Sequence, residues 1–102
     1  MDKSARRALR EIQKCVEQNR IIVLAHFLER MDQRGLFWMD VIGVIELPDD
    51  VFAGGAEEYG RPKWIINGTT INGFKIDIVC ILDEDELGKL VVFVTIYWRE
   101  RL

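Results

Sequence analysis

The feature that most constrains this chain is a nearly continuous run of Val, Ile and Phe between Lys89 and Trp98. A run of this kind predicts a strand that is buried on both faces. Two further strand candidates, Lys63–Ile71 and Phe74–Leu82, precede it, and the acidic segment Asp83–Gly88 predicts a turn before it. The pair Asn72-Gly73 is the strongest short hairpin signal, because both residue types tolerate the positive φ values of a type I′ turn. The C-terminal part therefore predicts three antiparallel strands.

The N-terminal half has helical periodicity instead. Ser4 suits the N-cap of a first helix, whose apolar residues recur three and four positions apart. A second helix is expected to stop at Gly35, since glycine readily takes the left-handed conformation that ends many helices. The run Ile21 to Leu24 is expected to be a connector or the start of this second helix. The three expected helices are residues 4–18, 24–35 and 36–46.

A chain of 102 residues is expected to form one domain, and about half of its residues are hydrophobic, which suffices for one core. Residues 48–62 are rich in Gly, Pro, Asp and Glu and predict a surface loop with room for one short edge strand. The expected fold class is α+β, with N-terminal helices packed on one face of a small twisted antiparallel sheet. Residues 1–19 would be a helical extension of a domain covering residues 20–98.

Several classes of protein are disfavoured by what the sequence lacks. No apolar run approaches the roughly 20 residues that span a bilayer, and Met1–Lys14 is polar, so a cytoplasmic location is expected. Cys15 and Cys80 are too few for a disulfide framework or a zinc site, and we expect both to be small buried residues. Gly54-Gly55 lacks the lysine of a phosphate-binding loop. We expect no metal and no cofactor.

The single histidine lies in the expected second helix. His26 and Arg30 are four residues apart and Arg34 is a further turn along, so the three side chains form a column on one helix face. A titratable imidazole beside fixed guanidinium groups suits chemistry on a phosphate. The alternative is an ordinary solvated face.

The predicted strands bring polar residues to one face of the sheet. A turn centred near Glu86 would place Asp77 opposite Thr95, and the Asn72-Gly73 turn would place Gly68 beside Asp77. The missing side chain of Gly68 would leave a gap where a ligand fits. The alternatives are a solvated cross-strand ion pair and ordinary strand propensity for the hydroxyl residues. The polar residues expected on this face are Lys75, Asp77, Thr95, Tyr97 and Arg99.

The first helix carries a basic face opposite its apolar stripe, formed by Arg6, Arg7, Arg10 and Lys14. This face is either solvated or a surface for an acidic partner or an RNA backbone. The formal net charge of −3 argues against broad, nonspecific nucleic-acid binding but leaves room for a small basic cleft.

An ordered set of residues resembles a known family. Residues 26–41 contain the pattern H-x-x-x-R-M-x-x-R-G-x-x-x-x-D-V, and Gly68, Gly73 and the closing pair Thr95-x-Tyr97 follow it. The set is similar to small bacterial RelE-type toxin-like domains that are catalogued as a domain of unknown function. Many of these are encoded beside a YgiT-type (MqsA-like) zinc-finger antitoxin. The resemblance covers roughly residues 20–98.

The resemblance implies the barnase, EndoU, colicin and RelE superfamily, whose members cleave RNA without a metal ion. It carries the family's proposed active residues over to His26, Arg30, Arg34, Thr95 and Tyr97. Attack by the RNA 2′-hydroxyl needs a base, an acid and positive charge on the phosphorane. His26 or Asp77 is the candidate base, and His26 or Tyr97 the candidate acid. Thr95 would donate to a phosphate oxygen, and Arg30 and Arg34 would clamp the phosphate with Lys75 and Arg99 as further substrate contacts.

Two functions are therefore expected, from different classes. The first is a metal-independent endoribonuclease toxin that is held inactive by a zinc-finger or helix-turn-helix antitoxin. The second is a binding module that kept the RelE-like fold and lost the chemistry, because the family often carries a histidine where this chain has Asp77. A homodimer built on strand edges or on the first helix is compatible with either.

Overall fold

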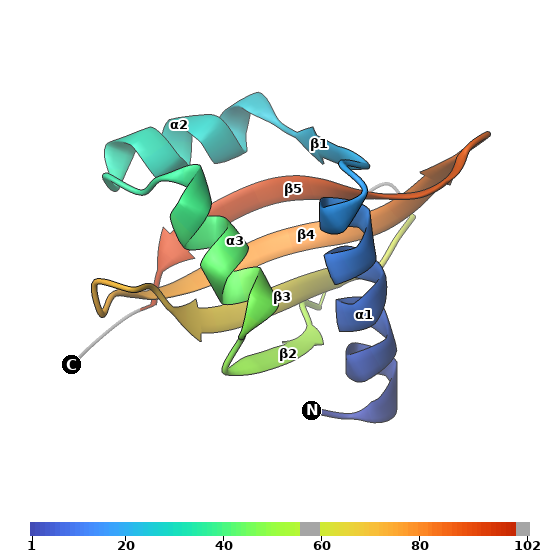
Figure 1. Ribbon diagram of the computed structural model, residues 1–102, viewed down its shortest axis with the longest axis horizontal. Coiled ribbons are helices and arrows are strands. Elements are labelled where there is room, and N and C mark those ends of the chain that lie inside the picture. Colours follow the sequence, from blue (N-terminus) through green and yellow to red (C-terminus); the bar gives the residue numbers. More distant parts are fainter. Residues whose placement is uncertain (56–59, 100–102) are drawn as a thin grey trace.

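The computed structural model describes residues 1–55 and 60–99 of the chain. These residues form three helices and a sheet of five strands (Figure 1). The helices are α1 (Lys3–Glu17), α2 (Ala25–Gln33) and α3 (Trp38–Glu46). The strands are β1 (Ile21–Val23), β2 (Asp50–Ala53), β3 (Lys63–Thr69), β4 (Lys75–Asp85) and β5 (Gly88–Trp98).

The sheet has the strand order β1-β5-β4-β3-β2 and is mixed, not purely antiparallel as expected. Residues 21–23 form β1 and pair in parallel with Val91–Phe93, so the expectation of a connector or helix start was wrong. Three β-branched side chains in a row are stiff at χ1 and favour the extended conformation. The short edge strand predicted within residues 48–62 is confirmed as β2.

The three helices share one core with the sheet. Figure 1 shows α1 and α3 in front of one face of the sheet, while α2 lies along β5 beyond the end of β1. The rings of Phe27 from α2, Trp38 from α3 and Phe93 from β5 lie 5.4–6.5 Å apart. The α+β class with N-terminal helices is thus confirmed. We call the sheet surface away from α1 and α3 the second face.

The ends of the helices follow local signals. α1 begins at Lys3, because Asp2 Oδ1 accepts a hydrogen bond from the Ala5 amide at 2.8 Å, so the cap is Asp2 and not Ser4. The predicted stop of the second helix at Gly35 is confirmed by a φ of 63° and by the Leu36 amide, which donates to the Met31 carbonyl. No helix of the described part of the chain combines the length and the hydropathy needed to cross a membrane.

The hairpin between β3 and β4 is longer than expected. The Thr70 amide donates to the Phe74 carbonyl at 2.7 Å, which leaves a three-residue loop in which Gly73 has a φ of 88°. The prediction of a two-residue type I′ turn at Asn72-Gly73 was therefore wrong, and the left-handed glycine instead closes a three-residue loop. This shifts the pairing by one residue, so Asn67 lies opposite Asp77 where Gly68 was expected.

The tip of the β4–β5 hairpin also differs from the prediction. Asp83–Asp85 belongs to β4, and only Glu86 and Leu87 remain between the strands, where an acidic turn over residues 83–88 was expected. An irregularity at Val79/Cys80 moves the pairing along β5 by one further residue. Asp77 therefore lies opposite Tyr97 and Val79 opposite Thr95, so the predicted Asp77–Thr95 register was wrong, and Lys75 lies opposite Thr69 on β3.

Gly68 makes room for a helix. It lies on the face of β3 that α3 covers, and a Cβ built on it would come within 2.6 Å of Val44 Cγ1. The expected ligand gap beside Asp77 is therefore wrong, because the one-residue shift turns Gly68 to the opposite face. The space that this glycine leaves lets α3 approach the sheet closely.

Candidate functional site

α2 presents His26 to solvent while it anchors itself through Phe27 and Met31, which are buried in the core. Arg30 Nε donates a long hydrogen bond of 3.4 Å to His26 Nε2. No other residue in 1–55 or 60–99 binds the terminal guanidinium nitrogens of Arg30, so they can take a further acceptor. The structure thus brings together the imidazole and the first of the two arginines that the sequence placed in a column.

The start of α2 is fixed against the middle of β5. The Leu24 amide donates to the Phe93 carbonyl at 3.2 Å, and the rings of Phe27 and Phe93 lie 5.4 Å apart. These contacts set the first turn of the helix, which carries His26, beside Phe93.

The end of α2 reaches the end of β5. Gln33, Arg34 and Trp98 line a shallow hollow of about 420 Å³. Arg34 is half-buried there, one turn beyond Arg30. α2 therefore runs beside the half of β5 between Phe93 and Trp98.

That half of β5 carries Thr95 and Tyr97 on the second face. Their neighbour Ile96 is buried under the helices, and alternate residues of a strand point to opposite faces. Thr95 is half-buried, and Tyr97 is exposed opposite Asp77. We call the His26–Arg30 pair, Arg34 and the adjoining segment of β5 the α2 margin. The convergence of the imidazole with Thr95 and Tyr97 on one phosphate stays a prediction.

Asp77 lies in a closed polar cluster on the second face. Its Oδ1 accepts a hydrogen bond of 2.7 Å from Asn67 Nδ2 and lies 3.5 Å from Arg99 Nε. The side chain of Asp77 is 17% exposed and that of Arg99 is 41% exposed. Asn67 and Arg99 therefore both contact Oδ1 of Asp77, and Oδ2 is the oxygen that remains to accept a proton from a substrate.

Lys75 lies apart from Asp77 along the same strand. Its side chain is exposed opposite Thr69, and its carbonyl accepts a hydrogen bond of 2.8 Å from the Arg99 amide. Asp77 takes Arg99 as its ion-pair partner, in place of the Lys75 that the cross-strand alternative would have used. The predicted residues Asp77, Tyr97 and Arg99 thus share one region, whereas His26 and Arg30 belong to the neighbouring helix.

Three residues of these sites were not anticipated from the sequence. Asn67 became visible only once the hairpin register was known. Gln33 and Trp98 line the hollow at the end of α2, and the ring of Trp98 stacks on Phe74 at 5.1 Å. An aromatic residue directly after the Thr95-x-Tyr97 pattern was the available signal for Trp98.

The cysteines are buried free thiols, as expected. Burial raises the pKa of the Cys80 thiol to about 12, and burial is also the main cause that raises the pKa of Cys15. Both residues therefore stay protonated at neutral pH and are poor nucleophiles. Within residues 1–55 and 60–99, no group of three or more His, Cys, Asp or Glu could hold a metal ion.

Comparison with known proteins gives one match. Residues 23–98 match the family described as Domain of unknown function (DUF4258). No curated protein and no solved structure matches the chain. The matched region begins at the last residue of β1 and contains α2 and strands β2 to β5, and therefore the whole α2 margin. α1 lies outside it. Because the match covers most of its length, the chain belongs to the DUF4258 family.

Proposed function

We propose that the protein is a metal-independent endoribonuclease, the toxin of a toxin–antitoxin pair that acts in the cytoplasm. The observation that carries the proposal is the His26–Arg30 pair, joined at 3.4 Å on a helix that runs along the half of β5 to which Thr95 and Tyr97 belong. An imidazole can transfer a proton in either direction, and a guanidinium fork suits a phosphate. The resemblance to RelE-type toxins supports the same reading.

In this proposal RNA lies across the α2 margin and is cleaved by its own 2′-hydroxyl. A base removes the proton of that hydroxyl, its oxygen attacks the phosphorus, and an acid protonates the leaving 5′-oxygen. His26 is the first candidate for the base, and Tyr97 for the acid. Arg30 stabilises the charge of the pentacoordinate phosphorane, with Arg34 beside it and the Thr95 hydroxyl as a further donor.

Asp77 remains the alternative base, and His26 would then act as the acid. Asp77 Oδ2 is free in the described structure, but Oδ1 is held by Asn67 and Arg99. A carboxylate held in this way is well oriented and has one oxygen available for a proton. Lys75 and Arg99 would contact the RNA on either side of this point.

A partner protein is the second part of the proposal, with an antitoxin of the zinc-finger or helix-turn-helix type as the expected class. A hollow of about 430 Å³ between α3 and the β3–β4 hairpin supports a protein contact. Its rim exposes Met39, Leu47 and Ile71, which are 75%, 83% and 96% exposed. Apolar side chains gathered in this way on a small protein favour a contact with another chain, either the antitoxin or a second copy.

The test is cleavage of RNA by the purified full chain in the presence of a chelator. We expect cleavage and growth arrest on expression, with arrest relieved by the neighbouring gene product. His26→Ala should lower the cleavage rate by about 10²–10⁴-fold, the usual effect of removing a general acid or base. Glu29→Ala, an exposed change on the same helix, is the matched control and should keep the rate. A folded protein that neither cleaves RNA nor arrests growth would refute the proposal.

The competing function is a binding module with the same fold and no chemistry. The Asn67–Asp77–Arg99 cluster favours it, since the toxin-like family that the sequence resembles often carries a histidine where this chain has Asp77. Under this reading His26→Ala leaves partner binding and every growth phenotype unchanged. The cleavage assay therefore separates the two candidates.

A further inference from the structure

The outer side of α1 carries a basic face with five cations. None of its cations makes an ion pair or a side-chain hydrogen bond with any residue in 1–55 or 60–99. In contrast, Arg20 pairs with Asp85, Arg61 with Asp83 and Arg99 with Asp77. The unpaired cations of α1 are Lys3, Arg6, Arg7, Arg10 and Lys14.

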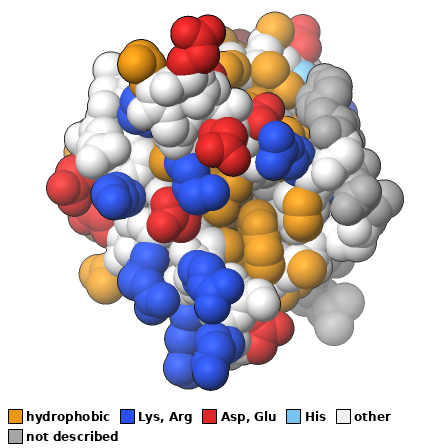
Figure 2. All heavy atoms as spheres, turned by 90° about the vertical axis from the view of Figure 1, so that its right-hand side faces the viewer, with side chains coloured by type: hydrophobic (Ala, Val, Ile, Leu, Met, Phe, Trp, Pro, Cys, Tyr) orange, Lys and Arg blue, Asp and Glu red, His pale blue; other side chains and the backbone are white. Residues whose placement is uncertain are grey.

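Four of these five cations form one straight stripe. Lys3, Arg7, Arg10 and Lys14 recur at intervals of four, three and four residues, which places them on one side of a helix. Eleven residues at a rise of 1.5 Å give the stripe a length of about 16 Å. Figure 2 shows blue side chains gathered at the bottom of the face, where the N-terminal half of α1 lies. In a chain of net charge −3, this stripe is a strong local excess of positive charge.

An aromatic hollow lies beside the stripe. Arg7 and Glu11 from α1, Trp64 from β3 and Lys89 from β5 contribute to the lining of a cavity of about 280 Å³. A second hollow of about 390 Å³ follows along α1, and Glu11 and Lys89 line both. Lys14 and Arg20 add positive charge to the second hollow. A path along α1 therefore combines cations with the half-buried ring of Trp64, which lines the first hollow and also packs on the core.

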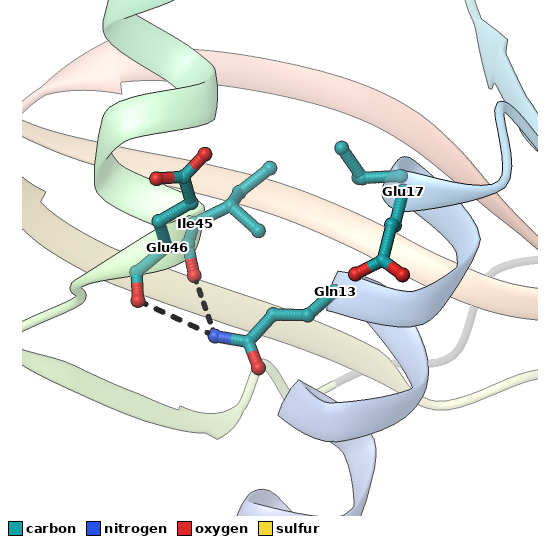
Figure 3. A pocket seen from close by; sticks show the side chains of 5 residues that line it. Gln13, Glu17, Ile45 and Glu46 are labelled. Carbon is teal, nitrogen blue, oxygen red and sulfur yellow. Dashed lines mark hydrogen bonds between the residues drawn. The ribbon is translucent and has the colours of Figure 1, made fainter.

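α1 is held firmly enough to act as a platform. Ala5, Ala8, Ile12 and Cys15 are buried on its inner side. Figure 3 shows the Gln13 side chain reaching across to the end of α3, where Nε2 donates to the Ile45 carbonyl at 2.9 Å. This bond satisfies a carbonyl at the end of α3 that has no acceptor role inside that helix. The basic stripe is consequently fixed in position relative to the sheet.

We propose that the basic face of α1 binds the phosphate backbone of single-stranded RNA, with one base stacked on Trp64. The proposal rests on the proposed function for the choice of RNA and extends it to a segment outside the family match. Cations that track the backbone and an aromatic ring that stacks a base are the two elements of single-strand binding. An acidic polypeptide would be held by the same cations, but it would gain nothing from the ring in the hollow.

The negative charge of Glu11 provides a further test of RNA binding at α1. Its half-buried carboxylate lines both hollows and repels a phosphate there. Removal of this charge should therefore strengthen RNA binding, whereas removal of a neighbouring cation should weaken it. A surface that only keeps the protein soluble would not respond in opposite directions.

The experiment measures binding of a labelled single-stranded oligonucleotide RNA to the full chain by fluorescence anisotropy across a range of salt concentrations. His26→Ala is used as the background, so that cleavage does not consume the probe. For single strands, the slope of log K against log salt changes by about 0.7 for each phosphate that the protein no longer neutralises. The variant with Arg7→Gln, Arg10→Gln and Lys14→Gln, three cations of the stripe, should therefore lose about two units of slope.

Three single changes sharpen the result. Arg10→Gln should weaken binding, whereas Arg61→Gln removes a cation already paired with Asp83 and should have little effect. Glu11→Gln should tighten binding a few-fold by removing one repulsive charge. Trp64→Leu should weaken binding by about 5- to 100-fold because the stacking surface is removed, with folding checked by circular dichroism.

An unchanged affinity and slope in the triple variant would overturn the proposal. Equal competition by polyglutamate and by RNA would also overturn it and would assign the face to an acidic protein partner. The two proposals fail separately. If the protein binds RNA through α1 but the wild-type chain does not cleave it, the nuclease proposal is refuted and the RNA-binding surface stands. If the protein cleaves RNA and the α1 variants bind it as wild type does, only the RNA-binding surface is refuted.

Discussion

The α2 margin and the Asn67–Asp77–Arg99 cluster both place arginine beside a titratable side chain, but they use the arginine differently. Among the described residues, the Arg30 side chain makes one long contact of 3.4 Å to His26, and its terminal nitrogens have no partner there. Arg99 lies 3.5 Å from a carboxylate that Asn67 also holds at 2.7 Å. A group whose partners are inside the fold stabilises the fold, while a group without such partners is available to a ligand. The comparison therefore separates a candidate for chemistry from a structural cluster.

Replacing each arginine in turn tests this difference most directly. Arg30→Ala should lower the rate of RNA cleavage by about 10²-fold, because a positive charge that stabilises the transition state is removed. Its free energy of unfolding should stay within about 0.5 kcal/mol of wild type, because the half-buried Arg30 side chain makes only one long hydrogen bond among the described residues. Cleavage rates and urea denaturation of the same preparations provide both measurements.

Arg99→Ala is the matched variant and should behave in the opposite way. It breaks the ion pair with the half-buried Asp77, so the loss should fall on stability, by about 0–1 kcal/mol for a partly exposed pair. The cleavage rate should change much less than in Arg30→Ala. Equal losses of activity in the two variants would show that the second face takes part in the chemistry.

Asp77→Ala should destabilise the fold more than Arg99→Ala does. It leaves the Asn67 amide without its acceptor in a buried position, which costs about 1–3 kcal/mol. Asp77→Asn keeps an oxygen for this hydrogen bond and loses only the charge, so it should remain closer to wild type in urea denaturation. If Asp77 is instead the catalytic base, both variants will lose cleavage to the same extent while only the alanine variant is destabilised.

Gly68→Ala tests the opposite face of β3, the strand that also carries Asn67. The new Cβ would lie 2.6 Å from Val44 Cγ1, and a stiff β-branched side chain has little freedom to move away. Overpacking of this kind costs about 1–3 kcal/mol. The control is Gly43→Ala, which meets no atom within 4 Å and should stabilise α3 by about 0.5–1 kcal/mol. Thermal unfolding of the two variants should therefore shift in opposite directions.

The fold was predictable from the sequence where periodicity decides it. The helices, the three long strands and the stop at Gly35 all follow from apolar spacing and from one glycine. The parallel strand β1 was missed, because a run of three apolar residues looks the same at the start of a helix and in a strand. Its partner, Val91–Phe93, lies far away in the sequence, and no local signal announces such a pairing.

The site depended on register, which the sequence does not specify locally. One extra residue in the loop before Phe74 exchanged Asn67 and Gly68 between the two faces of the sheet. The irregularity at Val79/Cys80 then moved Tyr97, not Thr95, opposite Asp77. In contrast, the pairing of His26 with Arg30 needs only the i, i+4 geometry of a helix, and the structure contains it.

The smallest predicted effect concerns a third arginine pair, at the tip of β4. A hydrogen bond from Arg20, with a further one from the Leu87 amide, lowers the pKa of the Asp85 carboxyl below its usual value. A carboxyl with a lowered pKa in the folded state adds stability above its unfolded pKa of about 3.9 and loses it as the pH falls through the folded value. Below about pH 4, wild type should therefore lose a small increment of stability that Asp85→Asn lacks.

The control is Glu84→Gln, which removes a neighbouring carboxylate that Arg20 does not bind. Besides Asp85, Arg20 bonds the carbonyls of Gly88 and Lys89, so in urea denaturation this variant should lose stability at low pH as wild type does. If wild type and Asp85→Asn lose stability identically at low pH, the exposed Arg20–Asp85 pair contributes nothing to the stability of the fold. Of the arginine pairs compared here, only Arg99–Asp77 on the second face would then stabilise it.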